Sequence, residues 1–380
     1  MIHETLSSVR ELSGVIAKRA EEIENSRQLP GDLVAALTAT GCFRMLAPAR
    51  HGGDELPMSR ALPVMAELAK ADPSVGWVVG QVALSQLIVG CCPPRAVDEA
   101  YAGGPDLLAA GAVAPKGRAS ANGDGWRVSG QWPFVTGCAH ASWFYLNCVE
   151  MAGRNLGRTP DGMPQTRIVL LPASDVVIED TWRVVGLRGT GSSDVRVSGV
   201  AVPAYRGFTL TPGDPAAAVA AARIARSSLI IAAVVTGIAE GALDDILALA
   251  GGGKRPALSA QRLSRSPLFQ DRLGEAHMLL RSAKALLAEQ ARDSDDLDAE
   301  SSPRQRAELR ATAAQVTGMA SQVVDAAYTL GGGSALYDTS PLQRRLRDMR
   351  AATQHFVAGR QSYQALGALL VGEEPEIGMF

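Results

Sequence analysis

The spacing of hydrophobic and polar positions changes twice along this chain. Up to about residue 108, apolar residues recur every three or four positions, as in LSSVRELSGVIAKRAEEIEN at residues 6–25. This spacing is typical of amphipathic helices, and proline, glycine and small polar residues mark where they begin and end. We expect helices over residues 6–25, 30–41, 59–70 and 72–89, and a short helix after Pro93 and Pro94.

Between residues 109 and 203 apolar residues recur at every second position, as in GWRVSG at 125–130 and SDVRVSGVAV at 193–202. This alternation, with glycine and asparagine between the segments, predicts strands joined by tight turns. We expect a turn-rich hairpin loop at residues 154–165 and a glycine- and serine-rich turn in GLRGTGSSDV at 186–195. That turn lacks the GxxxxGK pattern of a phosphate loop.

After residue 213 the chain is rich in alanine and leucine and has few helix breakers. We expect four long helices, over residues 217–249, 267–292, 302–330 and 341–370, which together predict a bundle. The most apolar of them contains Glu240, Asp244 and Asp245, which favours a buried helix over a membrane span. The acidic loop at 293–302 lacks the spacing of a calcium loop and is predicted to be a solvated turn.

These changes of pattern divide the chain into three parts and give the fold class α+β. We expect an N-terminal helical domain over residues 1–108, a middle β domain over 109–213 and a C-terminal helical domain over 214–380. A chain of 380 residues is also longer than one hydrophobic core usually supports.

Composition and charge exclude several classes of protein. Hydrophobic residues make up 47% and charged residues 20%, with a net charge of −2, which indicates neither a disordered tail nor a nucleic-acid-binding surface. The five cysteines are odd in number and lack paired C-x-x-C spacing, so we expect no disulfide framework and no metal site. The N-terminal segment has no apolar run typical of a signal peptide. We therefore expect a cytoplasmic protein that binds no membrane.

The stretch GQWPFVTGCAHASW at residues 130–143 is the first candidate for a functional site. Alternation predicts that Trp132, Phe134 and Thr136 share one surface of a strand. A flat aromatic ring beside a hydroxyl group suits a planar, hydrogen-bonding ligand such as a flavin ring. Tryptophan and phenylalanine are more often buried in a core, and spacing alone leaves both interpretations open.

Six segments taken in order resemble the acyl-CoA dehydrogenase superfamily: LPGDLVAALTATGCFRMLAPARHGG (29–53), DPSVGWV (72–78), GPDLLAAGAVAPKGRA (104–119), VSGQWPFVTGCAHASW (128–143), TWRVVGLRGTGSSDV (181–195) and SPLQRRLRDMRAATQH (340–355). Within it, they are most similar to the oxygenase components of two-component flavin-dependent monooxygenases, such as hydroxyphenylacetate and phenol hydroxylases. The resemblance implies an N-terminal helical domain, a middle β-barrel or sandwich domain and a C-terminal four-helix bundle.

The resemblance also implies a cofactor and partners. The expected cofactor is reduced FMN, alternatively FAD, which reacts with O₂ and is supplied by a separate NAD(P)H-dependent flavin reductase. A separate reductase also agrees with the sequence, because the chain has no GxGxxG turn set between a strand and a helix and followed by an acidic residue. The expected assembly is a homotetramer. The expected substrate is an aromatic or otherwise electron-rich small molecule, and whether carbon, nitrogen or sulfur is oxygenated stays open.

One position separates this reading from a dehydrogenase. A typical acyl-CoA dehydrogenase has a carboxylate base about two turns after the R-D pair matched by Arg347 and Asp348. Here no Asp or Glu lies between Asp348 and Glu373, and the position falls on Gln354, His355 and Phe356. Because some dehydrogenases carry the base on an earlier helix, an enzyme using Glu240, Asp244 or Asp245 is the alternative. A flavin-free binding or assembly subunit is a third possibility.

By resemblance, His355 and Thr136 are the catalytic candidates. His355 matches a histidine that helps to form and hold a flavin hydroperoxide, and an imidazole of near-neutral pKa could supply the proton. Thr136 stands where many relatives have a serine whose hydroxyl contacts the flavin ring. Trp132 and Phe134 would form the wall beside that ring.

The resemblance also assigns residues to the binding of the cofactor phosphate and of the substrate. Arg255 matches a basic residue that reaches the cofactor phosphate, often across a subunit interface, with Arg262 and Gln270 as weaker candidates and His140 as a brace for the strand turn. Ser85 and Ala112 stand where phenol-hydroxylating relatives can have a histidine and a serine, which predicts a more apolar substrate pocket. Trp77 and Tyr337 are expected to line that pocket.

Overall fold

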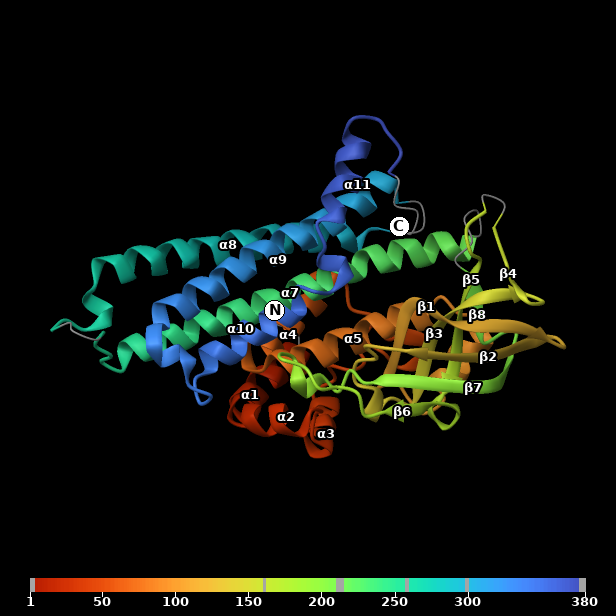
Figure 1. Cartoon of the computed structure of the whole chain (residues 1–380), viewed down its shortest axis with the longest axis horizontal. Helices are drawn as coiled ribbons and strands as arrows, with labels where there is room; N and C mark the ends of the chain where they lie inside the picture. Colours follow the sequence, from red (N-terminus) through yellow and green to blue (C-terminus); the bar gives the residue numbers. More distant parts are fainter. Residues whose placement is uncertain (1–3, 160–161, 210–214, 257–259, 298–300, 376–380) are drawn as a thin grey trace.

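The computed structural model describes residues 4–159, 162–209, 215–256, 260–297 and 301–375. Figure 1 shows the sheet at one end of the molecule, the long C-terminal helices along one side, and the N-terminal helices between and below them. The predicted three-part α+β arrangement is confirmed. Parts of the loops predicted at 154–165 and 293–302 lie outside the described residues.

The N-terminal part is helical as predicted, with the elements α1 (Glu4–Lys18), α2 (Ala20–Ser26), α3 (Gly31–Ala39), α4 (Met58–Ala71), α5 (Pro73–Val89) and α6 (Pro94–Ala100). The helix predicted over residues 6–25 is interrupted at Arg19, whose guanidinium binds the carboxylates of Glu22 and Asp32. Helix α5 starts where predicted, because the Asp72 side chain accepts hydrogen bonds from the backbone N–H groups of Ser74 and Val75. This helix is buried along almost its whole length.

The middle part is one mixed eight-stranded sheet with the order β6-β7-β2-β1-β3-β5-β8, in which β4 pairs with β3. Its strands are β1 (Ala109–Asn122), β2 (Gly125–Trp132), β3 (Trp143–Ala152), β4 (Asn155–Leu156), β5 (Thr166–Pro172), β6 (Val177–Glu179), β7 (Asp194–Pro203) and β8 (Gly207–Thr209). Strands β1 and β3 run parallel, and their register shifts between Ala112 and Gly117. The expected middle β part is confirmed as a sheet, whereas the predicted domain bounds stay a prediction.

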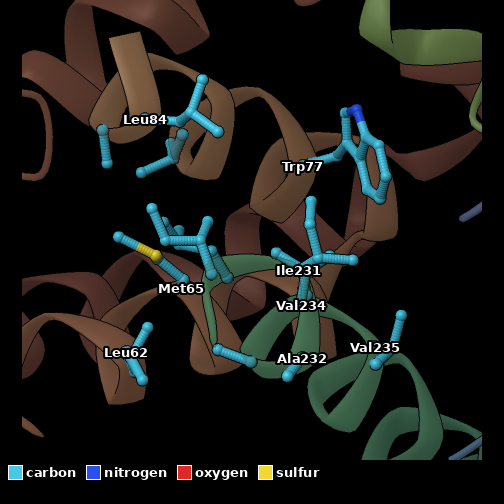
Figure 2. Packing of buried hydrophobic residues seen from close by; sticks show 14 of the residues in the cluster. Leu62, Met65, Trp77, Leu84, Ile231, Ala232, Val234 and Val235 are labelled. Carbon is cyan, nitrogen blue, oxygen red and sulfur yellow. The ribbon is translucent and has the colours of Figure 1, made fainter. Parts of the chain in front are cut away.

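The C-terminal part consists of α7 (Pro215–Gly251), α8 (Pro267–Asp295), α9 (Pro303–Gly331), α10 (Pro341–Ala352) and α11 (Gln361–Leu370). Helix α7 is long and apolar enough to cross a membrane by length and composition, but 67% of its most apolar window is buried inside the molecule. It packs against α4, α5 and α9. Figure 2 shows Leu62 and Met65 of α4 and Val234 of α7, which belong to this buried core.

The prediction of one continuous helix over residues 341–370 is wrong. Helix α10 ends at Ala352, a short 3₁₀ turn covers Phe356–Ala358, and α11 starts only at Gln361. At the break, the His355 side chain accepts a hydrogen bond from the backbone N–H of Val357 and so caps the 3₁₀ turn in place of a continuing helix. Figure 1 shows α11 turning out of the direction of the bundle.

Candidate active site

Two segments far apart in the sequence meet at neighbouring residues of α5. The imidazole of His355 lies edge-on to the indole of Trp77, with 5.6 Å between ring centroids. In the loop after β2, Gly137 lies so close to Val78 that an added Cβ would come within 3.4 Å of its Cγ1. The loop that carries Thr136 and the helix break that carries His355 therefore both contact the N-terminal half of α5, and their sharing of one site stays a prediction.

A third segment, the turn at residues 186–193, is fixed to α10. The backbone N–H of Leu187 donates to Asp348 Oδ1 at 2.6 Å, and Leu187 itself adopts a left-handed conformation with φ 52°. Gly186 packs directly on the helix, because an added Cβ would lie 2.1 Å from the carbonyl oxygen of Arg347. The turn is thus held immediately before the break that contains His355.

The Asp348 carboxyl group is buried, and burial raises its pKa to about 7, although the Leu187 N–H favours the charged form. The nearby Asp72 carboxylate adds to the shift. Burial also raises the pKa of Asp72 itself. Two buried carboxyl groups therefore anchor the turn and the start of α5.

A chain of hydroxyl groups joins the β2 loop to the turn. Thr136 Oγ1 lies 2.8 Å from Ser192 Oγ, which lies 2.7 Å from Thr190 Oγ1, and Thr190 donates to the Leu187 carbonyl at 2.8 Å. Thr190 and Ser192 are 1% and 3% exposed, whereas Thr136 is half-buried. The backbone N–H of Gly137 also donates to the Thr190 carbonyl at 3.0 Å. Sequence analysis missed this chain, although the turn itself was recognised.

The prediction that Trp132, Phe134 and Thr136 share one surface is wrong. Strand β2 ends at Trp132, where Pro133 offers no N–H to continue the ladder. Trp132 is 0% exposed, lies against Gly117 and Gly130, and donates its indole N–H to the Asn147 carbonyl at 2.7 Å. Trp132 is therefore a core residue of the sheet and forms no wall of a ligand site in this structure.

Phe134, by contrast, is presented to solvent. It is 70% exposed and adopts a left-handed conformation with φ 62°, a strained geometry for a residue of its size. Its ring lies edge-on to Trp182, with 6.2 Å between centroids. An aromatic surface is thus available next to the hydroxyl chain.

His355 is half-buried and neutral at pH 7. Its ring also stacks on Phe356 with 4.9 Å between centroids, and burial lowers its pKa to about 4. The expectation of a near-neutral pKa is therefore wrong. Since Nδ1 accepts a hydrogen bond from Val357 at 3.4 Å, the neutral ring carries its proton on Nε2. This imidazole can donate a hydrogen bond without carrying charge.

The predicted substrate residues are only partly brought together. Ser85 is buried on α5 and donates to the Gln81 carbonyl at 2.7 Å, and Trp77 is almost fully buried on the same helix. Ala112 is half-buried and lies where the pairing of β1 with β3 shifts in register. Tyr337 is 71% exposed and lies in the connection between α9 and α10, which Figure 1 shows at the end of the bundle away from the sheet. Within one chain it does not join the other three.

Arg255 lies at that same far end of the bundle. It is exposed and donates to the Ala260 carbonyl at 3.0 Å, and its neighbour Lys254 bonds Ser334 Oγ, which ties this loop to the turn before Tyr337. Arg262 and Gln270 are also exposed here. Their contact with a cofactor stays a prediction that requires a second chain.

Two hollows border the β2 loop. A small apolar one is lined by residues including Phe43, Val78, Val82, Leu108, Gly137 and His140. A groove of about 320 Å³ with a mixed polar and apolar lining lies between the α2–α3 link and the sheet, and its lining includes Arg27, Cys138, Trp182, Gly191 and Ser193. Burial lowers the pKa of His140, and its Nε2 is buried without a hydrogen-bond partner among the residues described.

The residues present fit a flavin, a planar ring with a polar edge. Phe134 offers an exposed aromatic face and Thr136 a hydroxyl group beside it. On the adjoining turn, Arg188 Nε is buried and has no hydrogen-bond partner in the described part of the chain, so it leaves a donor for acceptor oxygens of a ligand. Sequence analysis did not single out Arg188.

The carboxylates nominated for a dehydrogenase base are held in ion pairs. Glu240 binds Lys284 at 2.5 Å and Lys70 at 3.2 Å. Burial opposes ionisation of Glu240, but the two lysines outweigh it and lower its pKa. Asp244 binds Lys70 at 2.8 Å, and Asp245 binds Arg345 at 2.6 Å. A carboxylate stabilised in this way is a poor base.

Comparisons with known proteins identify the family of the chain. The family model described as "Acyl-CoA dehydrogenase, N-terminal domain" matches residues 3–91, and "Acyl-CoA dehydrogenase, C-terminal domain" matches 229–360. Indole-3-acetate monooxygenase of Pseudomonas putida is 30% identical over 369 residues, covering 94% of this chain and 91% of that protein. The oxygenase component of the FADH₂-dependent resorcinol hydroxylase of a Rhizobium species is 30% identical over 384 residues, with 94% and 91% covered.

The chain belongs to the flavin-dependent monooxygenases of the acyl-CoA dehydrogenase superfamily. The structure of XiaF from a Streptomyces species, in complex with FADH₂ and glycerol, superimposes on this monooxygenase with a TM-score of 0.90 at 26% identity and covers 99% of the chain and 97% of XiaF. The expected family and fold are thereby confirmed. This monooxygenase is an oxidoreductase, and the monooxygenase reading holds over the dehydrogenase alternative.

Proposed function

We propose that this chain is the oxygenase component of a two-component system that takes reduced flavin from a separate reductase and transfers one oxygen atom from O₂ to an aromatic small molecule. The observation that carries the proposal is the uncharged imidazole of His355 against Trp77 of α5, where a dehydrogenase would need a carboxylate. The loop with the Thr136 hydroxyl group contacts the next residue of that helix, Val78, and supports the same proposal. The names of both curated relatives support the aromatic substrate class.

The chain's own residues have distinct tasks in this reaction. Reduced flavin, when bound, supplies the chemistry that activates O₂. The Nε2–H of His355 donates a hydrogen bond to the oxygen that is to be transferred, without bringing a charge into the site. Trp77 and Phe356 shield that imidazole from water. Since buried Ser85 donates its hydroxyl proton to the Gln81 carbonyl, that proton is not available to a hydroxyl group of the substrate.

The proposal also covers the identity of the flavin, the oligomeric state and the location in the cell. The FADH₂ named for resorcinol hydroxylase and XiaF supports reduced FAD as the first cofactor to test, ahead of the FMN expected from sequence. The exposed Arg255 and Tyr337 support an assembly of several copies, with a homotetramer as the expected state. All five cysteines are unpaired, which suits a cytoplasmic location.

One set of measurements separates the three readings. The protein is titrated anaerobically with FADH₂ and with reduced FMN, and O₂ is then admitted in a stopped-flow spectrophotometer. A transient spectrum distinct from oxidised and reduced flavin, shortened in lifetime in His355→Ala, supports the oxygenase. Bleaching of bound oxidised flavin by an acyl-CoA would support the dehydrogenase instead. Failure to bind either reduced flavin would indicate a non-catalytic subunit.

A further inference from the structure

We propose that Gln81 of α5 holds the polar group of the substrate: its side-chain amide donates a hydrogen bond to a neutral acceptor oxygen, carbonyl or hydroxyl, on the aromatic ring compound. The inference rests on the proposed function, because it names the group that the oxygenase recognises on its substrate. It is carried by the place of Gln81 between Trp77 and Ser85 and by its amide nitrogen, which is buried without a hydrogen-bond partner among the described residues.

Trp77, Gln81 and Ser85 form one row along α5. They are four residues apart, and residues at this spacing lie one above the other on the same face of an α-helix. The His355 imidazole lies edge-on to the indole at the Trp77 end of the row. Gln81 is therefore one helical turn away from the residue that contacts the proposed catalytic imidazole.

The row lies where the bundle and the sheet approach α5. At about 100° per residue, it falls between Gly80 on one side of the helix and Val78 on the other. Gly80 packs on α7, since an added Cβ would lie 2.9 Å from Ile230 Cγ2, whereas Val78 lies against Gly137 in the loop after β2. A group held by Gln81 therefore lies between the bundle and the sheet.

The hydroxyl groups at the other end of the row have already spent their protons. Ser85 is 1% exposed and donates to the Gln81 carbonyl at 2.7 Å. Tyr145 of β3 is 3% exposed and forms a side-chain hydrogen bond with Ser85, so the phenol proton goes to the Ser85 oxygen. The Gln81 amide, by contrast, keeps its N–H donors for a ligand.

The chemistry of an amide donor selects the kind of group that binds. A buried N–H group without an acceptor destabilises the folded protein, and a ligand oxygen that accepts from it removes that penalty. A carbonyl or hydroxyl oxygen matches this uncharged donor. A carboxylate would lose its hydration without gaining an opposite charge from Gln81. Because Gln81 lies one turn from Trp77, the hydrogen bond also orients the aromatic ring toward His355.

The test compares ring compounds that differ by one carbonyl oxygen: 1-indanone with indane, and acetophenone with ethylbenzene. Their dissociation constants are measured by calorimetry without O₂, on protein loaded with FADH₂ or reduced FMN. In Gln81→Met, which keeps the length of the side chain and removes the amide, the preference for ketone over hydrocarbon should fall roughly five- to tenfold relative to wild type.

A second measurement separates binding from packing. Ligand-free Gln81→Met should melt about 1–2 °C higher than wild type, because the variant no longer buries an unpaired donor. A glutamine that only supported the fold would give a lower melting temperature on substitution.

Gln290→Met is the matched control, because Gln290 is a half-buried glutamine of α8 whose amide oxygen accepts from Thr312 Oγ1 at 3.0 Å. It should leave the preference for ketones unchanged. An unchanged preference in folded Gln81→Met for both pairs, or no binding of either ketone to flavin-loaded wild type, would overturn the inference. Wild-type protein that binds neither reduced flavin would instead overturn the proposed function, so the two failures are distinguishable.

Discussion

At the residue scale, His355 and Asp348 are held in protonation states that their surroundings set. Burial lowers the pKa of His355 to about 4 and raises that of Asp348 to about 7. Asp348 lies near the end of α10, and His355 lies in the break that follows it. Their contributions to the stability of the protein change with pH in opposite directions. A single substitution at either residue therefore isolates the contribution of that residue to the pH dependence of stability.

His355 should make the protein less stable in acid. Because its pKa is lower in the folded state than the ordinary 6.5, the unfolded chain binds more protons between about pH 4 and 6.5, and stability is lost as pH falls through that window. His355→Gln should remove this loss, on the order of 2 kcal/mol between pH 7 and 4. Urea denaturation at both pH values measures it, and an equal acid loss in the variant would contradict the assignment.

Asp348 should act in the opposite direction. The folded state holds the proton that the unfolded state releases near pH 4, so stability falls as pH rises from about 4 to 7 and is flat above that. Asp348→Asn keeps an acceptor for the Leu187 N–H and removes the charge, so its stability relative to wild type should rise by about 2 kcal/mol across this window.

Asp348→Ala is the companion variant, because it leaves the Leu187 N–H without its acceptor. It should be less stable by about 1–3 kcal/mol at pH 5, where wild-type Asp348 is largely neutral. If Asp348→Asn and wild type differed equally at pH 4 and pH 8, the carboxyl group would not titrate in this range.

At the element scale, the turn at residues 186–193 joins the sheet loop, α5 and α10. Its approach to α10 depends on Gly186, where an added Cβ would lie 2.1 Å from the Arg347 carbonyl. A backbone atom cannot move aside as a side chain can, so the whole turn would have to shift. The position of the hydroxyl chain therefore depends on a residue that has no side chain.

Gly186→Ala should destabilise the protein by about 2–4 kcal/mol and weaken binding of reduced flavin. Gly14→Ala is the control, since an added Cβ at Gly14 meets nothing within 4 Å and should stabilise α1 by about 0.5–1 kcal/mol. Thermal denaturation and anaerobic flavin titration measure both effects. Normal stability and flavin binding in Gly186→Ala would show that the turn tolerates displacement.

At the scale of the whole molecule, the candidate residues lie in two places. The segments that carry Thr136 and His355 both contact α5, whereas Arg255 and Tyr337 lie at the far end of the bundle. One chain cannot bring these two groups to one flavin. If both serve the cofactor, each complete site must contain residues from two copies.

Complementation between two defective variants tests this arrangement. Arg255→Glu and Thr136→Val should each lose most reduced-flavin binding when alone. In a co-refolded equal mixture, a site with intact Thr136 from one chain and intact Arg255 from another forms in about a quarter of cases, so a matching share of binding should return. No recovery, with mixed assemblies confirmed by mass spectrometry, would place Arg255 outside the site.

The sequence by itself determined the order and kind of the elements, because apolar spacing records which face of each helix or strand is buried. It predicted α5 with its Asp72 cap, the β domain and the long helices α7 to α9, and its motifs indicated the family. The missing carboxylate after Asp348 separated the enzyme from dehydrogenases, and the catalytic roles given to His355 and Thr136 stay predictions.

Only the tertiary structure decided the surroundings of these residues. Local alternation could not show that β2 stops at Pro133, so that Trp132 is buried and Phe134 exposed, nor that the last helix breaks at His355. The hydroxyl chain and the neutral imidazole likewise depend on contacts between segments far apart in the sequence. Burial and hydrogen-bond direction are properties of those contacts, and they exist only after the chain has folded.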